Sequence, residues 1–131
     1  MRQKQSICIV DNDEVYKFLV KKILEIKELA DSVLMFSDGE EVYNYIKQNK
    51  GKPDLLPDII LLDINMPIMD GFLFMEEYIK LKHEINKDIA IYLVTSSIDP
   101  IDLKRSKKYT DIKDFITKPI SVEVLEKISE R

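Results

Sequence analysis

The chain has 131 residues, of which 45% are hydrophobic and 34% are charged, and its formal net charge is −4. This length and composition predict one soluble globular domain and argue against a disordered or fibrous chain. The small negative charge gives no electrostatic basis for binding nucleic acid or an acidic membrane, and we find neither a signal peptide nor the ~20 consecutive apolar residues of a membrane span.

The first strand is predicted over residues 6–10, an apolar run with the continuous hydrophobicity of a strand covered on both faces. It contains Cys8, the single cysteine, whose place in an apolar run predicts a core position. A single cysteine cannot form an internal disulfide, which fits the reducing cytoplasm. An amphipathic helix is predicted over residues 14–27, with lysines between its apolar side chains. Those apolar side chains, which recur at helical spacing, are Val15, Phe18, Leu19, Ile23 and Ile26.

The same order of strand and helix recurs four more times. The further strands are predicted over residues 32–36, 58–62, 89–94 and 114–117. Ser37 and Glu40 form a capping-box pattern at the start of the second helix, and the third helix follows Gly71. Asp99 precedes a proline at the start of the fourth helix, and Ser121 can cap the fifth.

Five strands that alternate with five helices predict an α/β fold, a doubly wound five-stranded parallel sheet with helices on both faces. We expect a single domain over residues 1–131. Residues 48–57 contain Gly51, Pro53 and Pro57, and they are better interpreted as a long loop before the third strand than as a linker between domains.

Polar side chains follow four of the predicted strands at their carboxyl ends. They are Asp11, Asn12 and Asp13 after the first strand, Asp63 after the third, Thr95 after the fourth and Lys118 after the fifth. Ligands of open parallel sheets bind beyond these ends, where the strand order reverses. Clustered carboxylates repel each other unless a cation is present, and oxygen ligands suit Mg²⁺. With a hydroxyl and an ammonium on the other rim, the pattern predicts a pocket for a phosphoryl group.

Each of these residues also has a simpler explanation when it is taken alone. Asp13 is explained by capping of the following helix, Thr95 by the end of a strand, and Lys118 by a solvated loop. Their joint placement favours a binding site.

Four segments resemble the signature segments of the response-regulator receiver domain of two-component signalling, in the same order. They are IVDND (9–13), LLDINMPIMDG (61–71), VTSS (94–97) and FITKP (115–119). The resemblance covers residues 6 to about 130 and implies a flavodoxin-like sheet with strand order 2-1-3-4-5. It also implies a receiver domain without an output domain, whose effect comes through partner binding.

The resemblance implies that Asp63 is the phospho-acceptor for a sensor histidine kinase or a histidine phosphotransfer protein. It implies a Mg²⁺ site made by Asp11, Asn12, Asp63 and the backbone carbonyl of Asn65. The family has a second acid where this chain has Asn12, so we expect weaker Mg²⁺ binding. Lys118 would pair with the phosphoryl oxygens.

The resemblance also assigns a switch. Thr95 would bond the phosphoryl group, Phe115 would turn inward, and the altered surface would bind a downstream protein. Phe115 has the alternative explanation of a core aromatic. A cis bond is expected before Pro119, and the resemblance leaves a homodimer open.

Other functions remain to be weighed against this one. A receiver-like adaptor that binds partners without phosphorylation is the main alternative, and Asn12 favours it. A phosphatase of the haloacid-dehalogenase type needs an aspartate where this chain has Asn65, and a flavodoxin needs a phosphate loop that is missing after the first strand. We therefore expect a signalling protein that catalyses only its own Mg²⁺-dependent phosphorylation and dephosphorylation, not a conventional enzyme.

Overall fold

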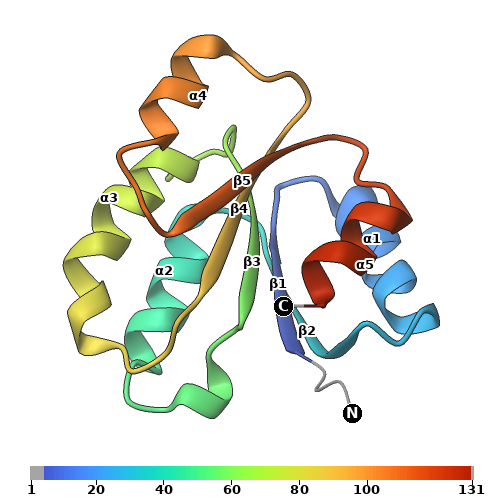
Figure 1. Cartoon of the computed structure of the whole chain (residues 1–131). Coiled ribbons are helices and arrows are strands. Elements are labelled where there is room, and N and C mark those ends of the chain that lie inside the picture. The colour runs from blue at the N-terminus through green and yellow to red at the C-terminus, as the bar shows by residue number, and fades with distance from the viewer. Residues whose placement is uncertain (1–4, 131) are drawn as a thin grey trace.

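The strands of the chain form one parallel sheet in a computed structural model that describes residues 5–130 (Figure 1). They are β1 (Gln5–Val10), β2 (Ala30–Phe36), β3 (Ile59–Asp63), β4 (Ala90–Thr95) and β5 (Ile112–Thr117). Their order in the sheet is β2-β1-β3-β4-β5, and every neighbouring pair is parallel. The predicted doubly wound α/β fold and its strand order are confirmed.

Helices cover both faces of this sheet. They are α1 (Glu14–Ile26), α2 (Gly39–Gln48), α3 (Gly71–Leu81), α4 (Pro100–Ser106) and α5 (Val122–Ser129). Figure 1 shows α1 and α5 on one face and α2 and α3 on the other, with α4 on the side of α3. Within residues 5–130, no helix is long and apolar enough to cross a membrane.

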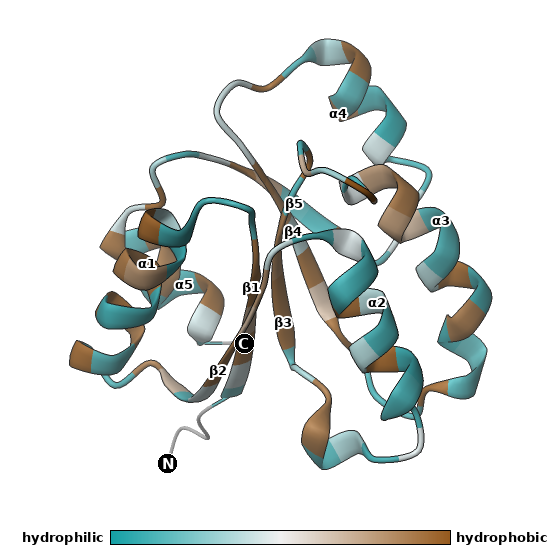
Figure 2. Cartoon of the chain, turned by 180° about the vertical axis from the view of Figure 1, so that it is seen from behind, coloured by the Kyte–Doolittle hydropathy of each residue, from teal (hydrophilic) through white to brown (hydrophobic). Residues whose placement is uncertain are grey.

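The continuous hydrophobicity of the central strands follows from burial on two faces. All five residues of β3 are buried. Ile59 and Leu61 belong to the core beneath α1 and α5, whereas Ile60 and Leu62 belong to the core beneath α2 and α3. The apolar colour of β1 and β3 in Figure 2 runs along each strand for this reason.

The face that α1 turns toward the sheet differs from the predicted one. The side chains of Val15, Phe18, Leu19 and Ile26 are all more than half exposed. The buried residues of the helix are Lys17, Val20 and Leu24. Lys17 tolerates burial because its ammonium donates to Phe36 O (3.3 Å) and Ser37 Oγ (3.1 Å) and pairs with Glu14 (2.9 Å).

Side-chain caps begin the helices, and one of them is displaced from its predicted position. Asp99 and Ser121 cap α4 and α5 as expected. Helix α2 is capped by Asp38 instead of Ser37, since Asp38 Oδ1 accepts from the N–H of Glu41 at 3.0 Å. Glu41 Oε1 accepts from the N–H of Ser37, the residue before the cap, at 2.6 Å, so the cap lies one residue later than predicted and the return bond of a capping box goes to Ser37 instead of the capping residue.

Candidate functional site

Two buried carboxylates and one ammonium meet at the carboxyl ends of β1, β3 and β5. The strand order reverses between β1 and β3, and Val10 pairs with Leu62 there, so Asp11 and Asp63 emerge side by side. Their residues are 1% and 6% exposed. Lys118 Nζ lies 2.5 Å from Asp11 Oδ2 and 3.5 Å from Asp63 Oδ2. The structure thus brings together three of the side chains that the sequence singles out.

The charges of this cluster shift the pKa values of its members. Burial raises the pKa of Asp63, and the negative charge of Asp11 raises it further, while the charge of Lys118 opposes both effects. Burial lowers the pKa of Lys118, but its bond to Asp11 and the charges of the two carboxylates outweigh burial, so that its pKa lies above the ordinary value. Lys118 is therefore a firmly charged ammonium at neutral pH.

Backbone hydrogen bonds hold the cluster in place. Asp11 Oδ1 accepts from the N–H of Asp13 at 2.9 Å, and the backbone N–H of Asp11 donates to Phe36 O at 3.0 Å. The backbone N–H of Lys118 donates to Thr95 O at 2.8 Å, and the peptide bond from Lys118 to Pro119 is cis, as expected. Asp13 caps α1 through the N–H of Tyr16, which is the simpler explanation given above for that residue.

The loop from β3 to α3 packs tightly against the Asp63 backbone. The N–H of Gly71 donates to Ile64 O at 2.9 Å. A Cβ atom at Gly71 would lie 2.8 Å from Asp63 O, so no other residue fits without a shift of the backbone. The φ angle of Gly71 is not positive, and its role is this close approach. Ile68 instead occupies the left-handed region with φ 67°, which is unfavourable for a β-branched residue.

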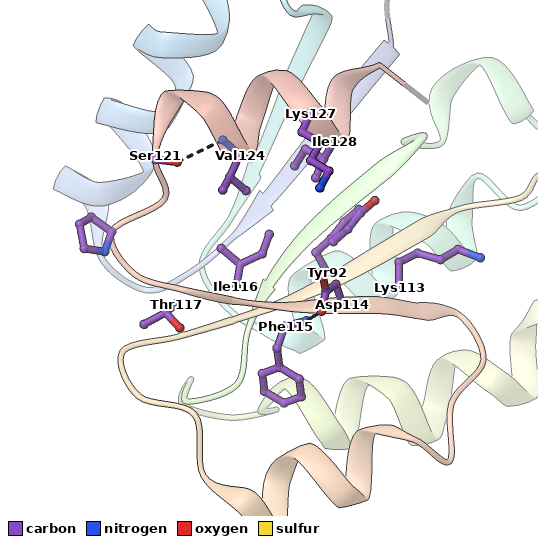
Figure 3. Close-up of a pocket in the computed structure, with 11 residues that line it drawn as sticks. Tyr92, Lys113, Asp114, Phe115, Ile116, Thr117, Ser121, Val124, Lys127 and Ile128 are labelled. Carbon is purple, nitrogen blue, oxygen red and sulfur yellow. Dashed lines mark hydrogen bonds between the residues drawn. The ribbon is translucent and has the colours of Figure 1, made fainter.

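The other candidate residues lie around this cluster. Thr95 is buried at the end of β4, and its hydroxyl donates to Ser97 O at 3.1 Å. Phe115 is half-buried, and Figure 3 shows its ring on the α4 side of β5, opposite to Ile116. It packs against the core beneath α2 and α3. The exposed side chains of Asn12 and Asn65 lie next to the buried carboxylates in the chain.

One aromatic contact at this site is absent from the sequence interpretation. The ring of Tyr16, in the first turn of α1, lies with its centroid 4.5 Å from Lys118 Nζ. The pKa of the Tyr16 hydroxyl is raised by burial and by the charges of Asp11 and Asp63. The sequence does place an aromatic residue one helical turn after the acids at the end of β1. Whether that residue faces Lys118, however, depends on how α1 is rotated about its own axis, and the sequence pattern did not predict that rotation.

The donor set suits a hard cation together with an anion. Residues 5–130 hold no group of three or more histidine, cysteine, aspartate or glutamate side chains placed to bind a metal. Mg²⁺, however, is commonly held by one or two carboxylates and keeps several waters, so Asp11 and Asp63 fit it chemically. The ammonium of Lys118 adds the positive charge that a bound phosphoryl group requires.

A separate groove lies between β5 and α5 (Figure 3). Its walls include Tyr92, Ile116, Val124 and Ile128, with Lys113 and Lys127 among its charged members. None of the three charged residues of the cluster lines this groove. The candidate site is therefore the charged cluster at the strand ends.

Comparison with known proteins gives a consistent result. The model of the response regulator receiver domain family matches residues 7–130. The sensor histidine kinase CheAY of Helicobacter pylori is 30% identical over 125 residues, which are 95% of this chain and 14% of that protein. The chain thus spans a small part of this relative.

Solved structures share the fold. A two-component response regulator from Cytophaga hutchinsonii has a TM-score of 0.85 with 21% identity, and the alignment covers 96% of this chain and 95% of that one. The receiver domain of a sensor histidine kinase from Pseudomonas aeruginosa, described with a magnesium ion in its active site cleft, has a TM-score of 0.73 with 20% identity, covering 98% and 97%. The chain belongs to the response regulator receiver domain family of two-component signalling.

Proposed function

We propose that Asp63 accepts a phosphoryl group from the phosphohistidine of a sensor histidine kinase or a histidine phosphotransfer protein. The observation that carries this proposal is the contact of one ammonium with two buried carboxylates at the point where the strand order reverses. An oxygen of ionised Asp63 attacks the phosphorus and forms a P–O bond. The P–N bond breaks, its electron pair returns to the histidine ring, and the product is an acyl phosphate.

In this proposal Lys118 and a divalent cation together stabilise the negative charge of the carboxylates and of the transferred phosphoryl group. Lys118 lies within reach of both carboxylates and stabilises the charge on the oxygens of the transferred group. Asp11, Asp63, the side chain of Asn12 and the backbone carbonyl of Asn65 would hold Mg²⁺. When bound, Mg²⁺ supplies the positive charge that lets the phosphoryl oxygens approach two carboxylates.

Thr95 and Phe115 are the switch of this proposal. The Thr95 hydroxyl now donates within its own loop, and it turns to the phosphoryl group once that group is present. The half-buried Phe115 ring then moves inward and changes the surface of α4, β5 and α5 for a downstream protein. The buried free thiol of Cys8 supports the cytoplasm as the place of this reaction.

The test is intact-mass spectrometry after incubation with acetyl phosphate, with and without Mg²⁺. We expect a gain of one phosphoryl group that requires Mg²⁺ and disappears in Asp63→Asn. Asp99→Asn is the matched control, because Asp99 only caps α4 and asparagine caps as well. Asp99→Asn should gain the group as the unaltered chain does.

A receiver-like adaptor is the second candidate function, and Asn12, which removes one acid from the site, favours it. The adaptor predicts no mass gain from acetyl phosphate or from a histidine kinase. It also predicts backbone amide spectra that do not change when beryllofluoride, a phosphoryl mimic, is added with Mg²⁺. That pair of results would replace the phospho-acceptor with the adaptor.

A further inference from the structure

The ammonium of Lys118 is held by three groups from three different elements. Asp11 Oδ2 lies 2.5 Å from Nζ, Asp63 Oδ2 lies 3.5 Å away, and the centroid of the Tyr16 ring lies 4.5 Å away. The Lys118 side chain is 21% exposed. The ring is the only uncharged member among these three contacts.

Contacts other than the one with Lys118 set the position of Tyr16. Its backbone N–H donates to Asp13 Oδ1 at 3.1 Å, which sets the start of α1. Its side chain packs against the core that α1 and α5 share. The hydroxyl is buried and has no hydrogen-bond partner among the described residues. The face of the ring, not the hydroxyl, therefore makes the contact that the structure shows.

A lysine needs such support more than an arginine would. Its ammonium is a point charge on a flexible four-carbon chain, and the side chain loses much rotamer entropy when it is held in one place. A charge that is already in position stabilises a transition state without reorganisation. An aromatic face within about 6 Å attracts an ammonium and does so whether or not the neighbouring carboxylates are ionised or otherwise engaged.

We propose that Tyr16 is a positioning residue for phosphoryl transfer, whose ring holds the Lys118 ammonium over the gap between Asp11 and Asp63. This inference rests on the proposed function for its effect on rate, but not for its geometry. The ring keeps Lys118 in place when an incoming phosphoryl group draws the carboxylates into other contacts. Loss of the ring lets the lysine side chain explore other rotamers, and fewer molecules are ready to react.

The first readout is the ¹H chemical shift of the Lys118 Hε protons in metal-free protein. Protons over an aromatic face are shifted upfield, so the unaltered chain and Tyr16→Phe should both show the shift. Tyr16→Leu should lose it. Should Tyr16→Leu fail to fold, Tyr16→Met replaces it, because it also removes the ring and retains an apolar side chain.

The second readout is the initial rate of phosphoryl uptake from acetyl phosphate in the presence of Mg²⁺. We expect Tyr16→Leu to be about three- to tenfold slower, the range that one cation–π contact gives. Tyr16→Phe should restore most of the rate. The matched control is Tyr43→Leu, which removes a half-buried ring of α2 whose centroid lies 6.0 Å from Lys47 Nζ, away from the charged cluster, and should leave the rate unaltered.

Two results would overturn the inference. One is an upfield Lys118 shift and a full rate that both persist in Tyr16→Leu. The other is an equal loss of rate in Tyr16→Phe and Tyr16→Leu, which would assign the effect to the hydroxyl. If the unaltered chain takes up no phosphoryl group, the proposed function fails separately, and the Lys118 shift alone decides whether the ring holds the ammonium.

Discussion

Replacement of Lys118 by methionine removes the ammonium and retains most of the volume of the side chain. Asp11 and Asp63 then remain buried beside each other without a cation. Removal of one partner from a buried ion pair destabilises a protein by about 3–5 kcal/mol. Because the Lys118 side chain is 21% exposed, solvent screens part of the interaction, and we expect a loss of about 2–4 kcal/mol near pH 7.

The loss should depend on pH in a defined direction. The pKa of Asp63 is already raised by burial and by Asp11, and removal of Lys118 raises it further. A carboxyl whose pKa is higher in the folded than in the unfolded chain destabilises the fold only where it is ionised. The difference between Lys118→Met and the unaltered chain should therefore be full above the raised pKa of Asp63, shrink as the pH falls below that pKa, and be lost by the unfolded value of about 4.

Urea unfolding in EDTA at neutral and acidic pH measures this difference, and the same titration with Mg²⁺ completes the test. We expect Mg²⁺ to stabilise the folded chain by binding it, and the gain should be larger in Lys118→Met because the ammonium no longer competes for the carboxylates. Lys113→Met, on the exposed part of β5, is the control for loss of a lysine. An equal loss at both pH values, or no loss at all, would refute the electrostatic account of the cluster.

Three further predictions concern other parts of the site. Gly71→Ala should lower the free energy of unfolding by about 1–3 kcal/mol in urea titrations, because the added Cβ would lie 2.8 Å from a backbone oxygen. Gly51→Ala is the control: open space surrounds Gly51, so this change should be neutral or slightly stabilising. Ile68→Asn should stabilise the chain by about 1 kcal/mol, because asparagine tolerates the left-handed backbone region that Ile68 occupies. Ile26 is about equally exposed but does not have a positive φ, so Ile26→Asn should not stabilise the chain, and a gain in that variant would contradict the reasoning. Asn12→Asp should tighten Mg²⁺ binding roughly tenfold in a magnesium titration, since it adds a negative ligand, and an unchanged affinity would show that this side chain does not reach the metal.

The sheet and its charged end could be predicted from the sequence because both depend on strong local signals. Four apolar residues that run directly into Asp63 indicate a strand buried on two faces that ends at a carboxylate. Lys118 is likewise placed by the end of its strand. Parallel strands bring their carboxyl ends to one edge of the sheet. The order of the strands is therefore enough to predict that Asp63 meets Asp11, 52 positions before it, and Lys118, 55 positions after it.

The rotation of α1 could not be predicted in the same way. Lys17 is buried because Phe36 O and Ser37 Oγ accept its hydrogen bonds, and these two residues lie at the end of β2 and just after it, about twenty residues later in the chain. Once Lys17 turns inward, Val15 and Phe18 turn outward and Tyr16 turns toward Lys118. The aromatic contact at the site was missed for the same reason as the buried lysine.

The backbone conformation of the loop from β3 to α3 could not be predicted from the sequence pattern either. The N–H of Met69 donates to Pro67 O at 2.7 Å, which closes a three-residue turn around Ile68 and forces its positive φ. Isoleucine gives no local signal for such a turn. The need for glycine at position 71 likewise appears only when the α3 start and the Asp63 carbonyl are seen together.

Localisation of the phosphoryl group tests the central claim most directly. The chain is incubated with acetyl phosphate and Mg²⁺ and then reduced with borohydride, which converts an aspartyl phosphate to homoserine, and the peptides are sequenced by mass spectrometry. Our account predicts homoserine at position 63, and none there when Mg²⁺ is omitted. Unmodified Asp63 in a chain that has gained the phosphoryl group elsewhere, at Asp11 or Asp13 for example, would contradict it.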